Sequence, residues 1–251
     1  MTALPPAFLA RPIAHRGYHD AAAGRIENSR SAFAAAMDAG YGIELDVQLS
    51  RDGVAMVFHD TDLDRLTDGT GPVHDRDAAT LQNIALTGGP DTLQTLPQVL
   101  RAINGTVPLL IEVKDQSGVM GDSDGRLEQA TADALAGYAG PVAVMSFNPD
   151  MVDRFGRLAP GVPRGLVGAA WRQTDDPHVP VDTRARLAAI ADFDTVGASF
   201  LSYDRTDLDL PFVQLRKQQG VPILCWTIRS REQETEARDL ADNITFEGYA
   251  A

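Results

Sequence analysis

The amino-acid sequence predicts an α/β fold, specifically a (β/α)₈ barrel of the TIM type that occupies residues 1–251 as a single domain. The first observation is that short apolar, β-branched runs recur along the chain, and most are followed by amphipathic, helix-like stretches. This alternation implies parallel strands joined by right-handed crossovers. The second is size, because α/β barrels commonly reach about 250 residues as one unit. The chain has 251 residues and no Pro/Gly/Ser-rich linker divides it.

Eight runs are candidate strands because each is short, apolar and rich in β-branched residues. Eight parallel strands in about 250 residues favour a closed barrel over an open sheet. In chain order the runs are PIAH (12–15), GIELDV (42–47), VAMVFH (54–59), VPLLIEV (107–113), PVAVMSF (141–147), RGLVG (164–168), DTVGAS (194–199) and VPILCWTI (221–228).

Six amphipathic segments between these runs are candidate helices. Several end in Gly, and Ser or Asp often precedes them, which is typical of helix C-termini and N-termini. They are SRSAFAAAMDAG (29–40), TLPQVLRAING (95–105), GRLEQATADALAGY (125–138), PDMVDRFGRL (149–158), LPFVQLRKQQG (210–220) and SREQETEARDLA (230–241).

One long stretch, from Asp60 to about Thr92, shows no strong pattern and contains the turn-forming run TDGTGP. Loops of this length are uncommon in compact domains and are often functional. We therefore expect this segment to lie over the mouth of the barrel.

The second predicted strand carries acidic side chains within an apolar run. Alternate residues of a strand point to opposite faces, so in GIELDVQL the acids Glu44 and Asp46 share one face and the apolar residues between them share the other. A half-exposed strand with one solvated face gives the same alternation. In a barrel, however, the two acids would point inward together.

Glu112, in the run LLIEVKD, takes the equivalent inward position on the strand predicted at 107–113. With Glu44 and Asp46 it would place three carboxylates at one end of the barrel. Three carboxylates so close together repel one another unless they are protonated or bridged by a cation. An all-oxygen ligand set suits a hard divalent ion, so one Mg²⁺ or Ca²⁺ is the predicted cofactor.

Two histidines close apolar runs on the face where barrel active sites are built. His15 ends the first predicted strand in IAHRG and His59 ends the third in VFHD, so they would flank the acids of the second strand. Two imidazoles near a metal suggest an acid and a base. His19, His74 and His178 have no such position and are interpreted as ordinary hydrogen-bonding residues.

Arg16 and Lys114 add the positive charge that a phosphate needs, Arg16 through its planar fork and Lys114 as a point charge. Either side chain could instead only form salt bridges with the clustered acids. A local positive site is required for a phosphate substrate, because 22 Lys and Arg against 35 Asp and Glu give the chain a net charge of −13. That charge should repel nucleic acid and anionic membrane surfaces, so we expect a small-molecule partner.

The remaining features favour a cytoplasmic protein without membrane insertion. The N-terminus has no basic start followed by an apolar core, and no segment approaches the roughly 18 apolar residues of a membrane span. Cys225 is the only cysteine and lies in the apolar run PILCW, so we expect a buried structural thiol. The sequence leaves the oligomeric state open.

Six motifs occur at characteristic spacings: AHRG (14–17), EN (27–28), GIELDVQLSRDG (42–53), FHD (58–60), LDRLTDGTG (63–71) and IEVK (111–114). Together they closely resemble the glycerophosphodiester phosphodiesterase family. The resemblance is strong over residues 12–115 and weaker but continuous to the end. There MSFNPD (145–150) and PILCWTI (222–228) look like the family's fifth and eighth strands.

The resemblance implies a barrel of the phospholipase-C-like phosphodiesterase type with one divalent metal. The implied site residues are Glu44, Asp46 and Glu112 for the metal, His15 and His59 as the acid–base pair, Arg16 and Lys114 for the phosphodiester, and Trp226 for the pocket wall. Glu27 matches the family's Glu-Asn pair and would orient the site. Alternatively, residues 27–29 only cap the helix that starts near Ser29, a reading that fits Asn28 better.

Three positions depart from the family pattern. Ser29 stands where Thr is commoner, Arg229 follows CWTI where Asn is frequent, and NITFEGY replaces the usual terminal Ile-x-Thr-Asp-x-Pro. The replacement of Thr by Ser29 is conservative and changes none of the implied roles. The other two lie where the alcohol part of a substrate would sit, so they put the substrate's identity in doubt but leave the metal and histidine residues unaffected.

The activity implied by the resemblance is metal-dependent hydrolysis of a glycerophosphodiester to sn-glycerol 3-phosphate and an alcohol, as part of lipid and glycerol metabolism. One alternative within the enzyme class is a lysophospholipase D or another barrel phosphodiesterase, which for a lysophospholipid would need an apolar groove beside the mouth. An alternative of another class is a non-catalytic phosphate-ligand binding protein, which the loss of a histidine or a metal-binding acid would indicate. All five of these residues are present.

Overall fold

The computed structural model describes residues 2–172 and 177–251. By their internal contacts, the described residues fall into two compact units. Unit 1 takes those within Met1–Ile13, Asp115–Ser123 and Ala143–Ala251, and unit 2 takes those within Ala14–Lys114 and Asp124–Val142.

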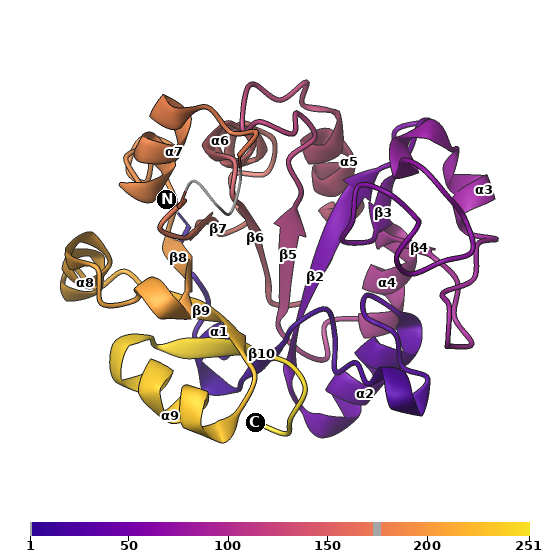
Figure 1. The fold of residues 1–251 in the computed structure, drawn as a ribbon, viewed down its shortest axis with the longest axis horizontal. Coiled ribbons are helices and arrows are strands. Elements are labelled where there is room, and N and C mark those ends of the chain that lie inside the picture. The colour runs from indigo at the N-terminus through magenta and orange to yellow at the C-terminus, as the bar shows by residue number, and fades with distance from the viewer. Residues whose placement is uncertain (1, 173–176) are drawn as a thin grey trace. The chain divides into compact units, whose positions relative to one another are not determined.

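The predicted (β/α)₈ barrel is confirmed (Figure 1). Eight strands pair in the order β1–β10–β9–β8–β7–β6–β5–β2, and β1 also pairs with β2, which closes the sheet. These strands are β1 (Ile13–Ala14), β2 (Gly42–Leu49), β5 (Leu109–Val113), β6 (Val142–Ser146), β7 (Arg164–Gly168), β8 (Phe200–Asp204), β9 (Ile223–Ile228) and β10 (Asn243–Phe246).

The run VAMVFH is not a barrel strand, so the prediction of a third parallel strand at 54–59 is wrong. β3 (Ala55–Val57) pairs antiparallel with β2, and β4 (Gln94–Thr95) pairs antiparallel with β3. The chain turns between β2 and β3 through Gly53, whose φ of +83° is in the left-handed region. The reason is connection length, because a parallel crossover needs a dozen or more residues and only a tight turn separates these two runs.

The strand predicted at 194–199 is displaced toward the C-terminus, because pairing with β7 begins only at Phe200. Gly197 has a φ of +64°, and this left-handed residue interrupts the run that was expected to be extended. The apolar residues before it, including Val196, are buried in a turn instead.

The eighth barrel strand is β10, in the run NITF, where no strand was predicted. Polar Asn243 and Thr245 hide its apolar pattern, although Ile244 and Phe246 are fully buried. The Asn243 Nδ2 group donates hydrogen bonds to the carbonyl oxygens of Phe8 and Arg11, both at 2.7 Å. The motifs assigned to a fourth, fifth and eighth strand therefore lie on the third, fourth and seventh barrel strands, β5, β6 and β9.

All six predicted helices are present, and the described chain has three more, α1 (Ala7–Ala10), α3 (Ala78–Leu81) and α7 (Val181–Ala188). Ser caps are confirmed where Ser29 and Ser230 accept hydrogen bonds from backbone N–H groups of the first turn, and Asn148, which was not predicted as a cap, does the same for α6. α7 has no continuous apolar stripe that could have revealed it. The six are α2 (Arg30–Ala39), α4 (Leu96–Ile103), α5 (Arg126–Leu135), α6 (Pro149–Leu158), α8 (Pro211–Gln218) and α9 (Arg231–Leu240).

Strand β2 is buried on both faces along its whole length. The alternative of a half-exposed strand with one solvated face is therefore wrong. β2 pairs in parallel with β5, and this register places Asp46 opposite Glu112. The acids of β2 are consequently interior groups that need partners or a counter-charge.

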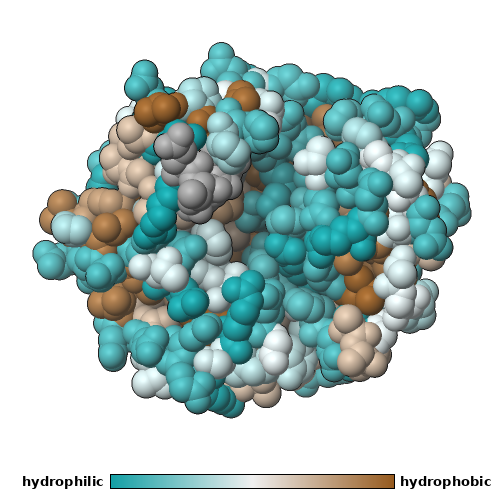
Figure 2. Space-filling model, viewed as in Figure 1, coloured by the Kyte–Doolittle hydropathy of each residue, from teal (hydrophilic) through white to brown (hydrophobic). Residues whose placement is uncertain are grey.

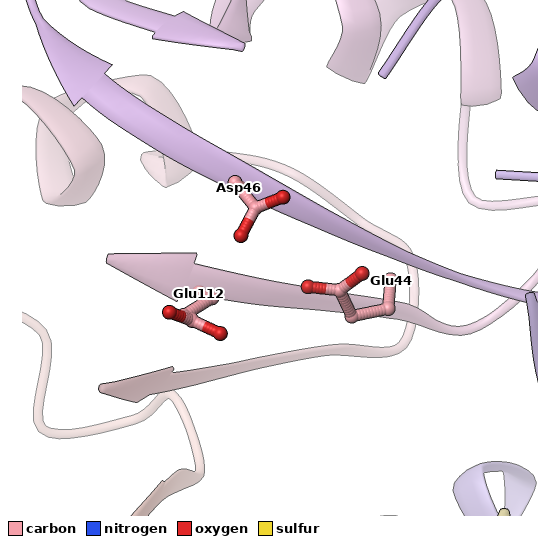
Figure 3. Close-up of side chains that lie close together, drawn as sticks. All are labelled: Glu44, Asp46 and Glu112. Carbon is pink, nitrogen blue, oxygen red and sulfur yellow. The ribbon is translucent and has the colours of Figure 1, made fainter. Parts of the chain in front are cut away.

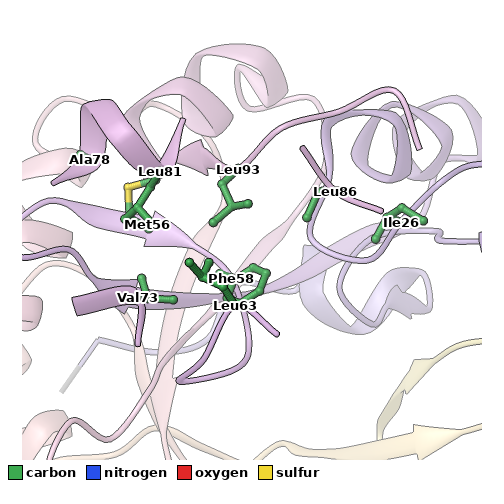
Figure 4. Packing of buried hydrophobic residues seen from close by; sticks show 9 residues of the cluster. All are labelled: Ile26, Met56, Phe58, Leu63, Val73, Ala78, Leu81, Leu86 and Leu93. Carbon is green, nitrogen blue, oxygen red and sulfur yellow. The ribbon is translucent and has the colours of Figure 1, made fainter. Parts of the chain in front are cut away.

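The segment that follows β3 is folded around a small core of its own in unit 2 (Figure 4). It contains a 3₁₀ turn, η2 (Val73–Asp75), and the short helix α3 (Ala78–Leu81), and isolated bridges such as Thr67 with Leu86 link its turns. The buried members of this cluster are Ile26, Met56, Phe58, Leu63, Val73, Ala78, Leu81, Leu86 and Leu93. The long patternless stretch is thus an ordered layer packed on the β2–β3 hairpin.

Shortening Leu81 to alanine is expected to lower the free energy of unfolding by about 2–5 kcal/mol, because it removes methyl groups from a closely packed site. Leu81 is fully buried within the cluster. Urea denaturation measures the loss, with Leu215→Ala as the matched control because Leu215 is 52% exposed. A loss no larger than that of the control would show that the cluster is not a packed core.

Two smaller expectations concern the thiol and the surface. Cys225 is buried as predicted, and burial raises the pKa of its thiol to about 12.

In the described part of the chain, no helix combines the length and apolar character needed to cross a bilayer. Hydrophilic residues predominate on the face that Figure 2 shows, with hydrophobic residues in separate groups.

Candidate active site

Three carboxylates from two neighbouring strands of unit 2 point toward one another (Figure 3). Glu44 and Asp46 lie on β2 and Glu112 lies on β5. Each residue offers an oxygen within 4.8 Å of those of the other two, and all three residues are buried. The structure thus brings together the three acids that the alternation pattern predicted to converge.

This cluster is electrostatically unfavourable without added positive charge. Burial, followed by the charges of Asp46 and Glu112, raises the pKa of Glu44 well above its usual value. Burial alone would also raise the pKa of Asp46, but the charges of Lys114 and other cations outweigh it and hold that pKa far below its usual range. Three buried carboxylates, of which Glu44 has a raised pKa, form an oxygen ligand set that fits a hard divalent cation.

Lys114 and Arg16 supply part of the missing positive charge. Lys114 Nζ lies 2.7 Å from Glu112 Oε1 and 3.3 Å from Asp46 Oδ1. Arg16 Nε lies 3.5 Å from Asp46 Oδ2, and the Arg16 backbone N–H donates to Glu44 Oε2 at 2.8 Å. The alternative of salt bridges to the acids is therefore observed, and contact with a phosphate stays a prediction.

The backbone beside the cluster adopts a conformation that non-glycine residues rarely take. Arg16 has a φ of 54° and Asn28 a φ of 55°, both in the left-handed region. The Asn28 N–H donates to the Arg16 carbonyl oxygen at 2.8 Å, which ties the two turns together. Such outliers persist only where surrounding contacts hold them, and they are common at functional sites.

The two predicted histidines both belong to unit 2. His15 follows β1 directly, next to the Arg16 N–H that binds Glu44. His59 follows the β3 strand of the hairpin, where the backbone N–H of Phe58 donates to the Asp46 carbonyl oxygen at 3.1 Å. His59 was expected at the end of a parallel barrel strand, and it instead reaches this region from the antiparallel hairpin.

His59 is held by the residue that follows it. Its Nδ1 atom lies 2.7 Å from Asp60 Oδ1, and Gln48 Nε2 donates to its backbone carbonyl oxygen at 2.9 Å. Burial lowers the pKa of His59, and the opposing charge of Asp46 does not fully compensate. With Nδ1 engaged by a carboxylate, Nε2 is the ring nitrogen suited to exchange a proton with a ligand.

The Glu-Asn pair has a structural explanation in the site. Glu27 Oε1 accepts a hydrogen bond from Arg16 Nη1 at 2.6 Å. Asn28 Nδ2 donates to Asp46 Oδ2 at 2.9 Å, so Asn28 holds a cluster acid, whereas Ser29 caps the helix. The helix-cap interpretation of Asn28 is wrong.

The sequence interpretation missed three supporting residues, namely Asn28, Asp60 and Arg65. The signal that could have found them was present in the quoted motifs EN, FHD and LDRLTDGTG, which contain these side chains. Neither periodicity nor charge balance distinguishes such residues from the many polar residues of a solvated loop.

Trp226 lies in unit 1, whereas the other predicted site residues lie in unit 2. Its Nε1–H donates to the Ser202 carbonyl oxygen at 3.1 Å, and its ring packs edge-to-face on Phe147 with centroids 5.5 Å apart. Arg229 Nε pairs with Glu247 Oε1 at 2.8 Å, so the two departures from the family pattern contact each other. A pocket-lining role for Trp226 stays a prediction.

Comparison with known proteins gives a consistent result. The model of the glycerophosphoryl diester phosphodiesterase family matches residues 15–243. The YhdW protein of Bacillus subtilis (strain 168) is 30% identical over 236 residues, which cover 90% of this chain and 88% of that protein. A glycerophosphodiester phosphodiesterase of Caldanaerobacter subterraneus is 34% identical over 167 residues, or 62% of this chain and 65% of that protein.

Solved structures show the same fold. A phosphodiesterase of Oleispira antarctica, solved in complex with the product sn-glycerol-3-phosphate, has a TM-score of 0.78 at 23% identity, and the match covers 96% of this chain and 94% of that one. A glycerophosphodiester phosphodiesterase of Thermotoga maritima has a TM-score of 0.70 at 22% identity, with 94% of each chain covered.

Proposed function

Because the chain belongs to the glycerophosphoryl diester phosphodiesterase family and is therefore a phosphoric diester hydrolase, we propose that it hydrolyses small glycerophosphodiesters to sn-glycerol 3-phosphate and an alcohol with one divalent cation. The observation that carries this proposal is the buried cluster of Glu44, Asp46 and Glu112. The product bound to the Oleispira antarctica enzyme supports the same class of substrate.

The three acids would hold the cation, Mg²⁺ or Ca²⁺. When bound, such an ion neutralises negative charge on phosphoryl oxygens. The acids fit this role because each offers a buried oxygen and because burial, followed by the charges of Asp46 and Glu112, raises the pKa of Glu44. Arg16 and Lys114, already at the edge of the cluster, would donate hydrogen bonds to the remaining phosphoryl oxygens and orient the diester.

His15 and His59 would carry the protons. Hydrolysis breaks the P–O bond to the alcohol and forms a P–O bond to an incoming oxygen. One imidazole takes the proton of the incoming hydroxyl, and the other gives a proton to the departing alkoxide. The incoming oxygen belongs either to water or to the substrate's own 2-hydroxyl, which gives a cyclic phosphate that water then opens, and both routes use the same two side chains.

The test is a substrate panel of glycerophosphocholine, glycerophosphoethanolamine, glycerophosphoglycerol, a lysophospholipid and bis(p-nitrophenyl) phosphate. We expect the small glycerol diesters to release sn-glycerol 3-phosphate and the lysophospholipid to react more slowly. The exposed large hydrophobic residues of the described chain are few and come from five separate segments: Leu9, Val119, Leu158, Val181 and Leu215.

Two variants separate site chemistry from contaminating activity in this panel. Asp46→Asn should abolish release because it removes a charge from the acid cluster, whereas Glu232→Gln should leave it unchanged because Glu232 is exposed on α9. If the lysophospholipid has the highest kcat/KM, the enzyme is a lysophospholipase D. Failure of every glycerol diester would refute the proposed substrate class.

A further inference from the structure

Arg65 is bound to two carboxylates at once, through all three of its guanidinium nitrogens. Nη1 and Nη2 donate to Glu27 Oε2 and Oε1 at 2.9 and 2.8 Å. Nε and Nη2 donate to Asp60 Oδ2 and Oδ1 at 2.6 and 2.9 Å. Two fork-shaped pairs on one guanidinium fix the relative orientation of both carboxylates, which a single point charge could not do.

Each of these carboxylates also binds a residue of the proposed reaction. Asp60 Oδ1, which accepts from Arg65 Nη2, is the atom that lies 2.7 Å from His59 Nδ1. Glu27 Oε1, which accepts from the same Nη2, is the atom that accepts from Arg16 Nη1 at 2.6 Å. One nitrogen of Arg65 is therefore two hydrogen bonds away from His59 on one side and from Arg16 on the other.

The exposure of the three partners indicates more than an ordinary surface ion pair, which contributes little to stability. The side chains of Glu27 and Asp60 are only 13% and 22% exposed, and that of Arg65 is 47% exposed. Burial would raise the pKa of both acids, yet hydrogen bonds from Arg65 are the largest opposing cause, and both pKa values are lowered. Without Arg65, Glu27 would retain Arg16 and Asp60 would retain His59, but the direct bridge between these two carboxylates would be lost.

We propose that Arg65 is a positioning residue that sets the orientations of His59 and Arg16 together, through Asp60 and Glu27. The inference rests on the proposed function and adds a role for the segment between β3 and β4, because Arg65 joins that segment to Glu27 and, through Glu27, to Arg16. Its small core, with Leu63 beside Arg65 in the chain, supports the loop that presents the guanidinium. In this proposal, the Arg65 side chain orients both His59, the acid or base of the reaction, and Arg16, which binds the phosphate.

The experiment compares Arg65→Ala, Arg65→Lys and Arg65→Gln with Arg51→Ala. Arg51 is a matched control because it also forms a two-point pair with a carboxylate at 2.8 and 2.6 Å in the same unit, and its partner, Asp77, is none of the proposed site residues. Arg65→Ala should lower kcat by between about 10-fold and 10²-fold, the loss expected from slight misplacement of reacting groups. Arg65→Lys should recover little, because it keeps the charge but cannot form both forks, and Arg51→Ala should be unchanged.

Two further readouts distinguish positioning from loss of folding. Ethylguanidinium, at concentrations that leave the melting temperature unchanged, should restore part of the kcat of Arg65→Ala. Adding Arg65→Ala to Asp60→Asn and Glu27→Gln together should lower kcat far less than it does in the wild-type chain, because the path through both acids is already broken. Calorimetric binding of Mg²⁺ or Ca²⁺ should be retained, since the hydrogen bonds of Arg65 go to Glu27 and Asp60 rather than to Glu44, Asp46 or Glu112.

The outcomes also separate this inference from the proposed function. If the wild-type protein hydrolyses none of the glycerol diesters, the proposed function is refuted. If the wild type is active and Arg65→Ala has an unchanged kcat, only the positioning role of Arg65 is refuted. If Arg65→Ala fails to fold, the same comparison is made with Arg65→Lys, which keeps the aliphatic stem, and a wild-type kcat in that variant would equally refute a need for two forks.

Discussion

Replacing either His15 or His59 by alanine is expected to lower kcat on the best glycerol diester by about 10²–10⁴-fold, the usual contribution of a positioned acid or base. Each variant removes one of the two proposed proton carriers, while the acid cluster of β2 and β5 stays intact. KM should change much less than kcat, because Arg16 and Lys114, the proposed phosphodiester-binding residues, remain in place. Steady-state kinetics on purified variants measures the effect.

His74→Ala is the matched control for these variants, because the His74 side chain is 57% exposed and lies in the η2 turn. It should retain wild-type kcat. The pH dependence gives a second check: a bell-shaped profile is expected for the wild type, and each active-site histidine variant should lose one limb of it. Near-normal turnover in His15→Ala or His59→Ala would remove that residue from the reaction.

Removal of divalent metal is expected to abolish hydrolysis, and added Mg²⁺ or Ca²⁺ should restore it. The reason is the cost of three buried carboxylates within 4.8 Å of one another, which only a cation or a proton relieves. Chelation followed by titration with each ion, with metal content verified by mass spectrometry, measures the requirement. Full activity in protein freed of metal would contradict this role for the cluster.

The same argument gives the sign of a pH effect on cation binding. In the metal-free chain, burial and the neighbouring acids raise the pKa of Glu44. A cation must then displace a proton from Glu44, so its apparent affinity should fall as the pH falls and proton release should accompany binding. Glu44→Gln should weaken binding strongly, whereas Asp133→Asn, at an exposed acid of α5, should not. Calorimetry in buffers of different ionisation enthalpy measures the released proton.

The acid cluster could be predicted from the sequence because it depends on the alternation of side chains along strands. Glu44 and Asp46 alternate with buried apolar residues, and Glu112 sits in a second strand of the same kind, so strand geometry alone brings them together. The barrel follows from the repeated alternation of strands and helices. Six helices could be placed because their apolar stripes and caps are local features.

What sequence reasoning could not find depends on pairing partners rather than on local pattern. VAMVFH has the composition of a barrel strand, and only the tight turn at Gly53 shows that it must run antiparallel to β2. β10 is concealed by polar Asn243, whose side chain binds the backbone of an N-terminal segment far away in the chain. Nothing in the local sequence distinguishes Arg65 from other arginines of polar loops, because its partners Glu27 and Asp60 come close to it only in the fold.

The antiparallel hairpin has a consequence for how this enzyme can be changed. β2 ends at Leu49 and β5 begins at Leu109, yet the two are direct neighbours in register, so everything between them leaves the barrel and returns to the adjacent strand. The connection can therefore differ in length and content between homologues without moving Asp46 relative to Glu112. A chimera that exchanges only exposed residues of this connection, while keeping the His59-to-Arg65 stretch and the buried cluster that supports it, should present a new loop surface beside an unaltered site. The connection between β2 and β5 is therefore a suitable place for sequence changes in engineered variants.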